Sequence, residues 1–403
     1  MNRFVSYLLA VALAAFATGA QLVVLPWLAV NELQLPATQV GWVQSAALFP
    51  SLLLMLLGGA VADQARVRSL LPLLYLLMAA CHMAMLWVLN TGALHLWSVL
   101  VYAASLGAMA AFIQPLRDRV LPSLIEAPSE LQSAVVKVSL CVYVAQAVGV
   151  CLAGQLDNLS FQIVLMVQGC ALLFCAVSLL GVLPRESRVP VDRENQSVGG
   201  ATIAEGMAFV RGHSILKHLI VLVGFNGFMH IGVFVVALPL LSRDIYQQDA
   251  LSFAALQLAF VLGGVVATLM ILRRGAVDQP GRAVLFSLLY AGIIMLAISA
   301  QPTVVGLFLL VFAWGVVAGV SASLGKALLQ QQVDESFRGR ALSIYQLALF
   351  GGAPLGALVC GYAVQLHGAL TLFKIGGATT LGVFVIYLGV RALWDVAPEN
   401  EAP

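Results

Sequence analysis

The run from Phe4 to Val30, FVSYLLAVALAAFATGAQLVVLPWLAV, contains no charged residue and is long enough to cross a membrane. At about 1.5 Å per residue, a helix of about 20 residues spans a hydrocarbon core of roughly 30 Å. Apolar runs of this kind recur as far as Leu393. They are too long and too uniformly apolar for the alternating strands of a membrane barrel. The chain is therefore expected to form transmembrane helices.

The composition of the 403-residue chain supports the same class. Only 9% of its residues are charged and 61% are hydrophobic, whereas a soluble domain carries roughly 25% charged residues. We predict an all-α polytopic membrane protein of about 12 transmembrane helices in two pseudo-symmetric six-helix halves. Breaks at polar or Gly/Pro clusters place the spans near 5–31, 39–62, 70–90, 95–116, 132–154, 160–183, 215–241, 252–273, 283–300, 303–329, 341–364 and 370–393.

The longest polar segment, Pro184 to Gly200, is rich in charge, Pro, Gly and Ser, and it separates the two halves. It is typical of a linker between domains. The predicted domains are an N-terminal six-helix bundle over 1–183, a cytoplasmic linker over 184–213, a C-terminal six-helix bundle over 214–394 and a cytoplasmic tail over 395–403.

Basic residues predict the orientation. All but two of the 20 Lys and Arg, the exceptions being Arg243 and Lys374, fall at the expected side that both termini share. Because such residues are retained in the cytoplasm, we expect cytoplasmic termini and location in the bacterial cytoplasmic (inner) membrane. The six cysteines lie in apolar runs, so neither a disulfide nor a metal site is predicted. We expect no cofactor and no nucleic-acid partner.

The two halves look like repeats of each other. Placing Ala134 over Ala341 aligns Gly149 with Gly356. Three further pairs occupy equivalent spans: Gly154 with Gly361, Leu25-Pro26 with Leu238-Pro239, and Gly58-Gly59 with Gly263-Gly264. Such duplication is typical of transporters whose halves rock around a central site.

The stretch GGAVADQARVR, Gly58 to Arg68, lies at the expected cytoplasmic end of the span at 39–62. Small residues let a neighbouring helix approach, and Asp63 can meet cations or the positive end of a helix. We interpret the stretch as a conformational latch, although a solvated loop carboxylate would also explain Asp63. The latch residues are Gly58, Gly59, Asp63, Arg66 and Arg68, with Arg338 and Arg340 in the other half.

At this loop the chain resembles the major facilitator superfamily, whose members carry Gly, Asp and basic residues there. It departs from that pattern at Gln64, where a basic residue is usual, and at Val67, which interrupts the basic pair. Three further stretches resemble the drug:proton antiporter-3 family, which includes the enterobactin exporter and macrolide efflux proteins. They are Phe337 to Ser343 leading into Gly352-Ala353-Pro354-Leu355-Gly356, Glu205 to Arg211, and Gln114 to Arg117.

The resemblance implies a major facilitator fold and export of a siderophore-like or drug-like compound by proton antiport, as in multidrug resistance efflux. A facilitator or importer of a small metabolite is the alternative. An intramembrane enzyme is disfavoured because no catalytic motif is found. The expected partners are a small-molecule substrate, protons and the lipid bilayer, and the protein is expected to be a monomer.

Two sets of residues follow as candidates. A helix-packing or gating role is predicted for Gly149, Gly154, Gly352, Pro354 and Gly356. Polar groups at membrane depth are costly and are therefore candidates for a substrate cavity, with hydrogen bonds between helices as the alternative. These cavity candidates are Gln21, Gln44, Gln114, Lys137, Gln146, Asn226, His230, Lys326 and Gln346. The two lysines can instead extend to the interface.

A proton-coupled exporter needs a group that exchanges protons between its two states. No carboxylate lies unambiguously at mid-membrane, so Glu32 and His230 become the proton-coupling candidates by elimination. His82 and His95 are expected to have packing or interfacial roles.

Overall fold

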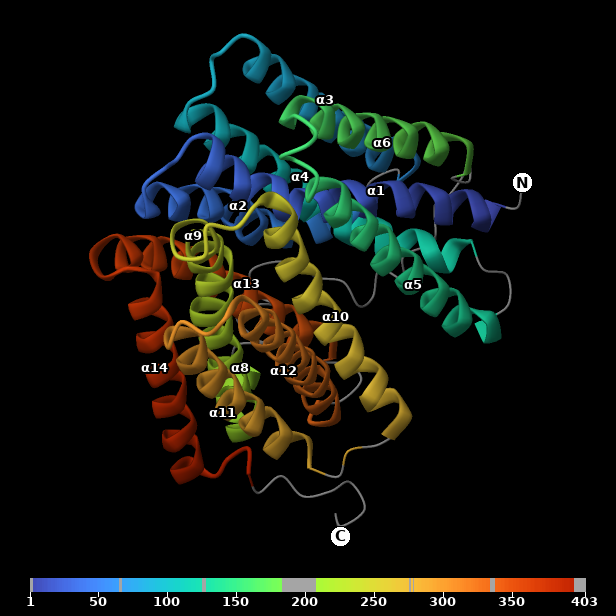
Figure 1. Cartoon of the computed structure of the whole chain (residues 1–403). Coiled ribbons are helices and arrows are strands. Elements are labelled where there is room, and N and C mark those ends of the chain that lie inside the picture. The colour runs from blue at the N-terminus through green and yellow to red at the C-terminus, as the bar shows by residue number, and fades with distance from the viewer. Residues whose placement is uncertain are drawn as a thin grey trace. The chain divides into compact units, whose positions relative to one another are not determined.

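The computed structural model describes residues 3–64, 67–124, 128–182, 208–274, 277, 279–333 and 338–394. Side chains are described in these ranges except at 55–64, 118–119, 122–123, 128–133, 135–136 and 338–340. All the described elements are helices (Figure 1). Most of the expected linker, residues 184–207, lies outside the described residues, as does the expected tail at 395–403.

The helices follow one another in two sets of six spans (Figure 1). In the first set, α1 (Arg3–Trp27) continues into η1 (Leu28–Glu32) and is followed by α2 (Ala37–Gln64), α3 (Val67–Asn90), α4 (Leu96–Ser123), α5 (Pro128–Ala153) and α6 (Phe161–Val182). In the second set, one span runs through α8 (Ser214–Asn226), η3 (Gly227–Ile231), η4 (Val233–Ala237) and α9 (Leu238–Asp244). We call it span 7. After it come α10 (Ala250–Arg274), α11 (Pro280–Ser299), α12 (Val304–Gln331), α13 (Arg338–His367) and α14 (Ala369–Val390).

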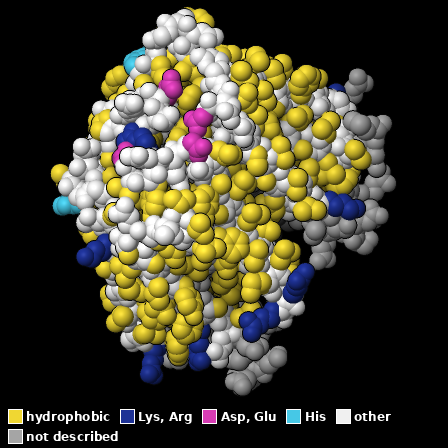
Figure 2. Space-filling view, viewed as in Figure 1, with side chains coloured by type: hydrophobic (Ala, Val, Ile, Leu, Met, Phe, Trp, Pro, Cys, Tyr) yellow, Lys and Arg dark blue, Asp and Glu magenta, His cyan; other side chains and the backbone are white. Residues whose placement is uncertain are grey.

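The helices have the length and surface of membrane spans. Ten described helical stretches are long and apolar enough to cross a membrane, and α5 carries a shorter apolar stretch, Lys137–Ala153. Large hydrophobic side chains are exposed, among them Trp97 at 67% and Leu366 at 75%. Figure 2 shows hydrophobic side chains over most of the face in view. A water-soluble surface would carry far more charge, so the prediction of a multi-pass membrane protein is confirmed.

The chain divides into two compact units. Unit 1 comprises residues 1–196 together with 247–255, so the first residues of α10 pack with it. Unit 2 comprises residues 197–246 and 256–403.

Helices at equivalent places along the chain pair in the same way inside each unit. In unit 1, α1 packs on α5, α2 on α4, and α3 on α6. In unit 2, span 7 packs on α13, α10 on α12, and α11 on α14. The expected pseudo-symmetry of two six-helix halves is therefore confirmed.

Glycines permit the closest of these approaches. A Cβ at Gly149 of α5 would overlap the backbone of α1 at Phe16. A Cβ at Gly356 of α13 would overlap the backbone of span 7 at Phe228. In a membrane, where no hydrophobic effect drives helices together, close contact between backbones is a main source of packing energy. The aligned pair Gly149 and Gly356 therefore occupies equivalent contacts in the two units.

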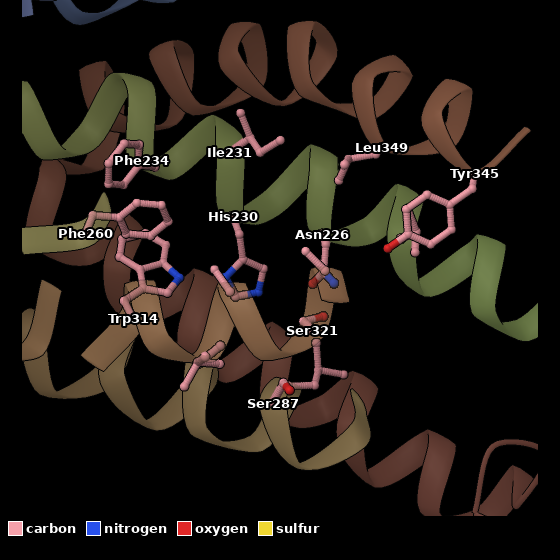
Figure 3. Close-up of a pocket in the computed structure, with 16 residues that line it drawn as sticks. Asn226, His230, Ile231, Phe234, Phe260, Ser287, Trp314, Ser321, Tyr345 and Leu349 are labelled. Atoms are coloured by element: carbon pink, nitrogen blue, oxygen red, sulfur yellow. The ribbon is translucent and has the colours of Figure 1, made fainter. Parts of the chain in front are cut away.

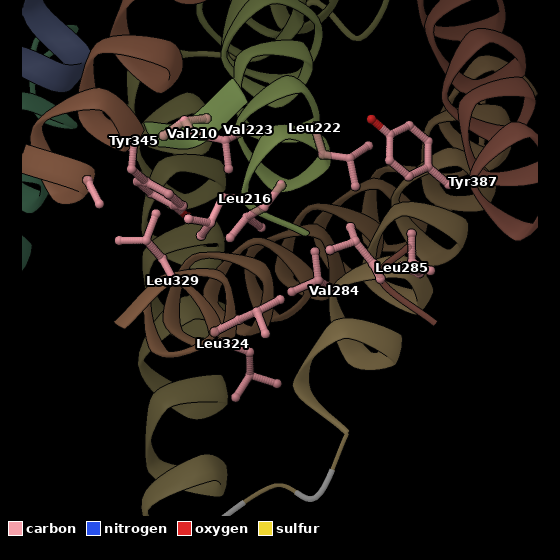
Figure 4. Packing of buried hydrophobic residues seen from close by; sticks show 14 of the residues in the cluster. Val210, Leu216, Leu222, Val223, Val284, Leu285, Leu324, Leu329, Tyr345 and Tyr387 are labelled. Atoms are coloured by element: carbon pink, nitrogen blue, oxygen red, sulfur yellow. The ribbon is translucent and has the colours of Figure 1, made fainter. Parts of the chain in front are cut away.

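Unit 2 also contains a dense apolar cluster, shown in Figure 4. Leu216 and Leu219 of α8, Leu285 of α11 and Leu328 of α12 are fully buried in it. Tyr345 of α13 belongs to this cluster and also lines the pocket described below. The cluster holds the helices together next to the pocket.

Candidate functional site

A pocket of about 230 Å³ lies among five spans of unit 2 (Figure 3). Span 7 contributes one wall with Asn226, His230 and Phe234, and α12 contributes another with Trp314 and Ser321. The other helices contribute Phe260 from α10, Ser287, Leu288 and Ala291 from α11, and Tyr345 and Leu349 from α13. Among the described residues that line the pocket, none is Asp, Glu, Lys or Arg.

One end of the pocket is aromatic. The Phe234 and Phe260 ring centroids are 4.4 Å apart, and the Trp314 ring lies edge-on to both at 5.7 and 6.0 Å. Phe373 of α14 packs against the far side of Trp314, at 6.2 Å. These distances are typical of tilted and edge-to-face aromatic pairs. The wall is therefore built from rings that hold one another in place and present their surfaces to an occupant.

The other end of the pocket is polar but uncharged. Asn226, Ser287, Ser321 and Tyr345 gather there, on the side of His230 away from Trp314 (Figure 3). An amide and three hydroxyl groups both donate and accept hydrogen bonds. An occupant with a ring at one end and oxygen or nitrogen atoms at the other would match both ends.

His230 lies between the two ends. Its Nε2 is 3.4 Å from Thr380 Oγ1, and the Thr380 hydroxyl donates to the Gly376 carbonyl at 2.7 Å. Because that hydroxyl has only one proton, the His230 Nε2 must be the donor to Thr380. The neutral imidazole then carries its lone pair on Nδ1.

Span 7 departs from regular α-helix at this level. Two π-helical turns, Gly227–Ile231 and Val233–Ala237, flank the pocket. π-Helical turns are rare and are frequent at functional sites, because they turn side chains away from the ordinary helical register. Gly227 and Gly232 lie against Leu349 and Gly356 of α13, where a Cβ would overlap the backbone. The wide turns and the glycines together bring His230 beside α14 while span 7 stays against α13.

Of the expected cavity residues, the pocket brings Asn226 and His230 together. Gln346 follows the lining residue Tyr345 and is half-buried. Lys137 and Lys326 are exposed. Gln114 is exposed and accepts a hydrogen bond from Arg117.

The remaining expected cavity residues lie in unit 1. The Gln21 Oε1 accepts hydrogen bonds from Tyr102 and Gln168. Gln44 is buried, and its Nε2 has no partner among the described residues. Gln146 is half-buried, and its backbone lies against Gly19 of α1.

The other expected sites are placed as follows. Glu32 is exposed at the end of η1. Gly352 lies against Gly224 and Phe228 of span 7, Pro354 is buried, and Gly154 lies against Ala254 within unit 1. In the expected latch, Arg66 lies outside the described residues. The side chains of Asp63, Arg338 and Arg340 are not among the described side chains, and the surroundings of Gly58 and Gly59 are not described either. Arg68 is half-buried at the start of α3.

The sequence reasoning missed the aromatic wall and the hydroxyl groups. Trp314, Phe260 and Phe234 are ordinary apolar residues in a membrane span, and nothing in their spacing separates them from residues that face lipid. One signal was available: Trp314 and Ser321 lie seven residues apart, which places them on one face of a helix.

Comparison with known proteins bears on the same architecture. The family model described as Major Facilitator Superfamily matches residues 7–319. The staphyloferrin A transporter of Staphylococcus aureus (strain NCTC 8325 / PS 47) is 24% identical over 365 residues, which cover 87% of each chain.

Two solved structures share the fold. A mutant of the nucleoside transporter NupG superposes with a TM-score of 0.78 at 12% identity, covering 96% of this chain and 99% of that one. A POT family transporter in complex with a thioalcohol-conjugated peptide superposes with a TM-score of 0.75 at 12% identity, covering 96% of each chain.

Proposed function

We propose, from the premise that the chain belongs to the Major Facilitator Superfamily, that it exports a small organic compound of siderophore-like or drug-like chemistry in exchange for protons. The chain is a membrane transporter, similar to a transporter of staphyloferrin A. Export and proton antiport are proposed because three stretches of the sequence resemble the drug:proton antiporter-3 family.

The observation that supports a small organic substrate is the two-ended pocket of unit 2. Its volume of about 230 Å³ exceeds the roughly 150 Å³ of an apolar cavity that admits a benzene ring. Rings at one end and neutral hydrogen-bonding groups at the other suit an uncharged, partly aromatic group of the substrate. A substrate recognised through its charge would instead need Lys, Arg or a carboxylate in the lining.

His230 is the proposed link between substrate and proton. Its ring lines the pocket, and its Nδ1 has no protein partner among the described residues. An imidazole changes charge near physiological pH after small changes in its surroundings, so an occupant beside it can alter its proton affinity. Glu32 remains a second candidate, since it is exposed at the end of span one.

The remaining predictions from the sequence complete the proposal. We propose cytoplasmic termini, a monomer, the domain limits given above, and a latch around Asp63 that stabilises one of two alternating conformations. Asp63→Asn is then expected to impair transport while folded protein stays in the membrane.

Transport into inverted membrane vesicles tests the proposal. Staphyloferrin A and ring-containing siderophores and drugs of similar size would be offered with and without a pH gradient. We expect accumulation of at least one compound that depends on the gradient and is abolished by a protonophore. Accumulation that does not depend on the pH gradient would favour the alternative function, a facilitator or importer of a small metabolite.

Variants then separate coupling from binding. Glu32→Gln, His230→Gln and the double variant should lose gradient-driven transport while keeping downhill exchange, because exchange needs the pocket but not the proton. His95→Gln, which changes an exposed histidine between α3 and α4, is the matched control. Full gradient-driven transport by the double variant would remove both residues from the coupling mechanism.

A further inference from the structure

A second polar site lies in unit 1, away from the pocket of unit 2. Four polar side chains from four helices meet there: Gln21 of α1, His82 of α3, Tyr102 of α4 and Gln168 of α6. His82 is 2% exposed, Tyr102 4% and Gln168 0%. Buried polar groups are normally fully hydrogen-bonded, so each bond in this core can be assigned.

The two amides have defined orientations. Gln168 Nε2 donates to the Ala17 carbonyl at 3.0 Å and to Gln21 Oε1 at 3.2 Å. Tyr102 donates its hydroxyl to the same Gln21 Oε1 at 3.1 Å. A flipped Gln168 amide would place its oxygen against the Ala17 carbonyl, which can only accept. Gln21 Nε2 and Gln168 Oε1 therefore take no part in these bonds, and both are buried without a partner among the described residues.

His82 has a defined tautomer for the same reason. Its Nδ1 is 2.8 Å from the Met78 carbonyl, so Nδ1 carries the proton and Nε2 carries the lone pair. The Nε2 is buried and has no partner in the part of the chain that the structure describes. The imidazole packs edge-to-face with Tyr102, at 5.6 Å between centroids. It also lies where α3 meets α6, since a Cβ at Gly169 would come within 3.5 Å of the His82 Cβ.

The four helices that form this core carry no charged residue at its level. The helix α6 contains no Asp, Glu, Lys or Arg, and the nearest such residues on the other three helices are Glu32, Arg68 and Arg117, about three turns or more from the core. The titratable groups on the packed elements are Tyr7 of α1, Tyr75 and Cys81 of α3, Tyr102 of α4, Cys170 and Cys175 of α6, and His95 before α4.

We propose that His82 Nε2 is a proton-binding site in the core of unit 1. The packing observed here suits the neutral ring, because a buried charge without a counter-charge is costly. When water reaches the core, Nε2 takes a proton and becomes a hydrogen-bond donor. The proton leaves when the core closes again, so proton occupancy follows conformation. A role of His82 in coupling rests on the proposed function, whereas proton binding at His82 does not depend on it.

A direct titration tests the proton site without any substrate. The full-length protein, with isotope-labelled histidine, is placed in lipid and followed by nitrogen NMR from about pH 5 to about pH 8. The His82 signal is the one missing from His82→Asn, whose amide still donates to the Met78 carbonyl. If that variant does not fold, single variants of the other five histidines assign His82 by elimination.

We expect Nε2 without a proton at high pH and protonated at low pH. A His82 ring that keeps the neutral Nδ1–H form across the whole range overturns the proposal and leaves a purely structural histidine.

Transport distinguishes this proposal from the proposed function. With a compound that the wild type accumulates, His82→Asn should reduce gradient-driven accumulation about 10-fold and flatten its pH profile. Downhill exchange should stay within about twofold, because the Met78 bond is kept. His95→Asn is the matched control. An unchanged pH profile in His82→Asn overturns a coupling role for His82. If the wild type transports no compound, the proposed function is overturned, and the titration alone then decides whether His82 is a proton site.

Discussion

The two units pair their helices alike but fill their centres differently. Where α1 meets α4 and α6, unit 1 is closed by a hydrogen-bonded set of Gln21, Tyr102 and Gln168. Where span 7 meets α12 and α14, unit 2 has a cavity lined by His230 and Trp314, and buried Thr380 is the hydrogen-bond partner of His230. A duplicated scaffold thus carries two kinds of centre. The helix pairing depends on glycines that both halves share, and the chemistry depends on a few residues that they do not.

The shared contacts should give the largest effect when they are broken. Gly149→Leu and Gly356→Leu place a side chain against the Phe16 and Phe228 backbones, and we expect each to lower the free energy of unfolding by about 3 kcal/mol or more. Thermal unfolding in detergent measures this. Gly382→Leu is the control, because nothing lies within 4 Å of that position. If Gly149→Leu were as stable as the wild type while Gly356→Leu were destabilised, the two contacts would not be equivalent.

The aromatic wall should matter for substrate and only in unit 2. Trp314→Leu removes the ring that holds Phe234 and Phe260 in place, and we expect about 10-fold weaker binding of the transported compound. Trp97→Leu, at an exposed tryptophan of α4, is the control. Binding can be followed by isothermal titration. Equal affinity in wild type and Trp314→Leu would show that the substrate does not bind against this aromatic wall.

The hydrogen bonds at the two centres should contribute unequally to stability. Gln168→Leu deprives Gln21 of a partner in a closed core, which we expect to cost about 1–3 kcal/mol. Thr380→Val removes the acceptor of His230, but the His230 ring lines the pocket and can hydrogen-bond to water there, so we expect less than about 1 kcal/mol. Chemical unfolding of both variants gives the comparison. Similar losses would show that the two centres are equally dependent on hydrogen bonds.

The last comparison concerns α2 and α10, which are equivalent helices with different starts. Pro36 precedes α2, whereas Asp249 precedes α10 and accepts from the Ser252 amide at 2.9 Å. We expect Asp249→Ala to cost about 1 kcal/mol at neutral pH.

The hydrogen bonds from Ser252 hold the pKa of Asp249 below its usual value. This stabilisation is therefore fully present above the ordinary pKa of about 3.9 and is lost as pH falls through the lowered folded pKa. Asp249→Asn should show no such loss on acidification. Parallel acid-unfolding curves for wild type and Asp249→Asn would contradict the assignment.

Hydropathy predicted the spans because the bilayer imposes one requirement on every one of them. An apolar run of membrane length must be a helix in lipid, whatever its neighbours are. The aligned pair Gly149 and Gly356 was predicted as packing positions, since only glycine allows backbones to touch, and the structure places both at equivalent contacts. Asn226 and His230 were singled out because polar groups are costly at that depth, and both line the pocket.

The same reasoning could not distinguish between polar residues that look alike in the sequence. Gln21 and Gln114 are both glutamines in apolar runs, yet Gln21 accepts two hydrogen bonds in a core and Gln114 is exposed. His82 was expected to pack or lie at an interface, and only its Met78 and Tyr102 contacts show which nitrogen is free. Periodicity gives the face of a helix on which a residue lies, but it does not say which helix, lipid or cavity that face meets.

The sequence by itself determined that the chain lies in a membrane, that it forms helices and that its two halves are repeats. Each of these depends on local composition or on residues repeated along the chain. The tertiary structure alone decided which spans meet, that one centre is closed by amides, and that the other is left open between rings. The physical reason is distance: Gln21, Tyr102 and Gln168 are far apart in the chain, and so are His230, Trp314 and Thr380. Hydrogen bonds and ring contacts act only over a few ångströms, so their partners exist only once the helices have packed.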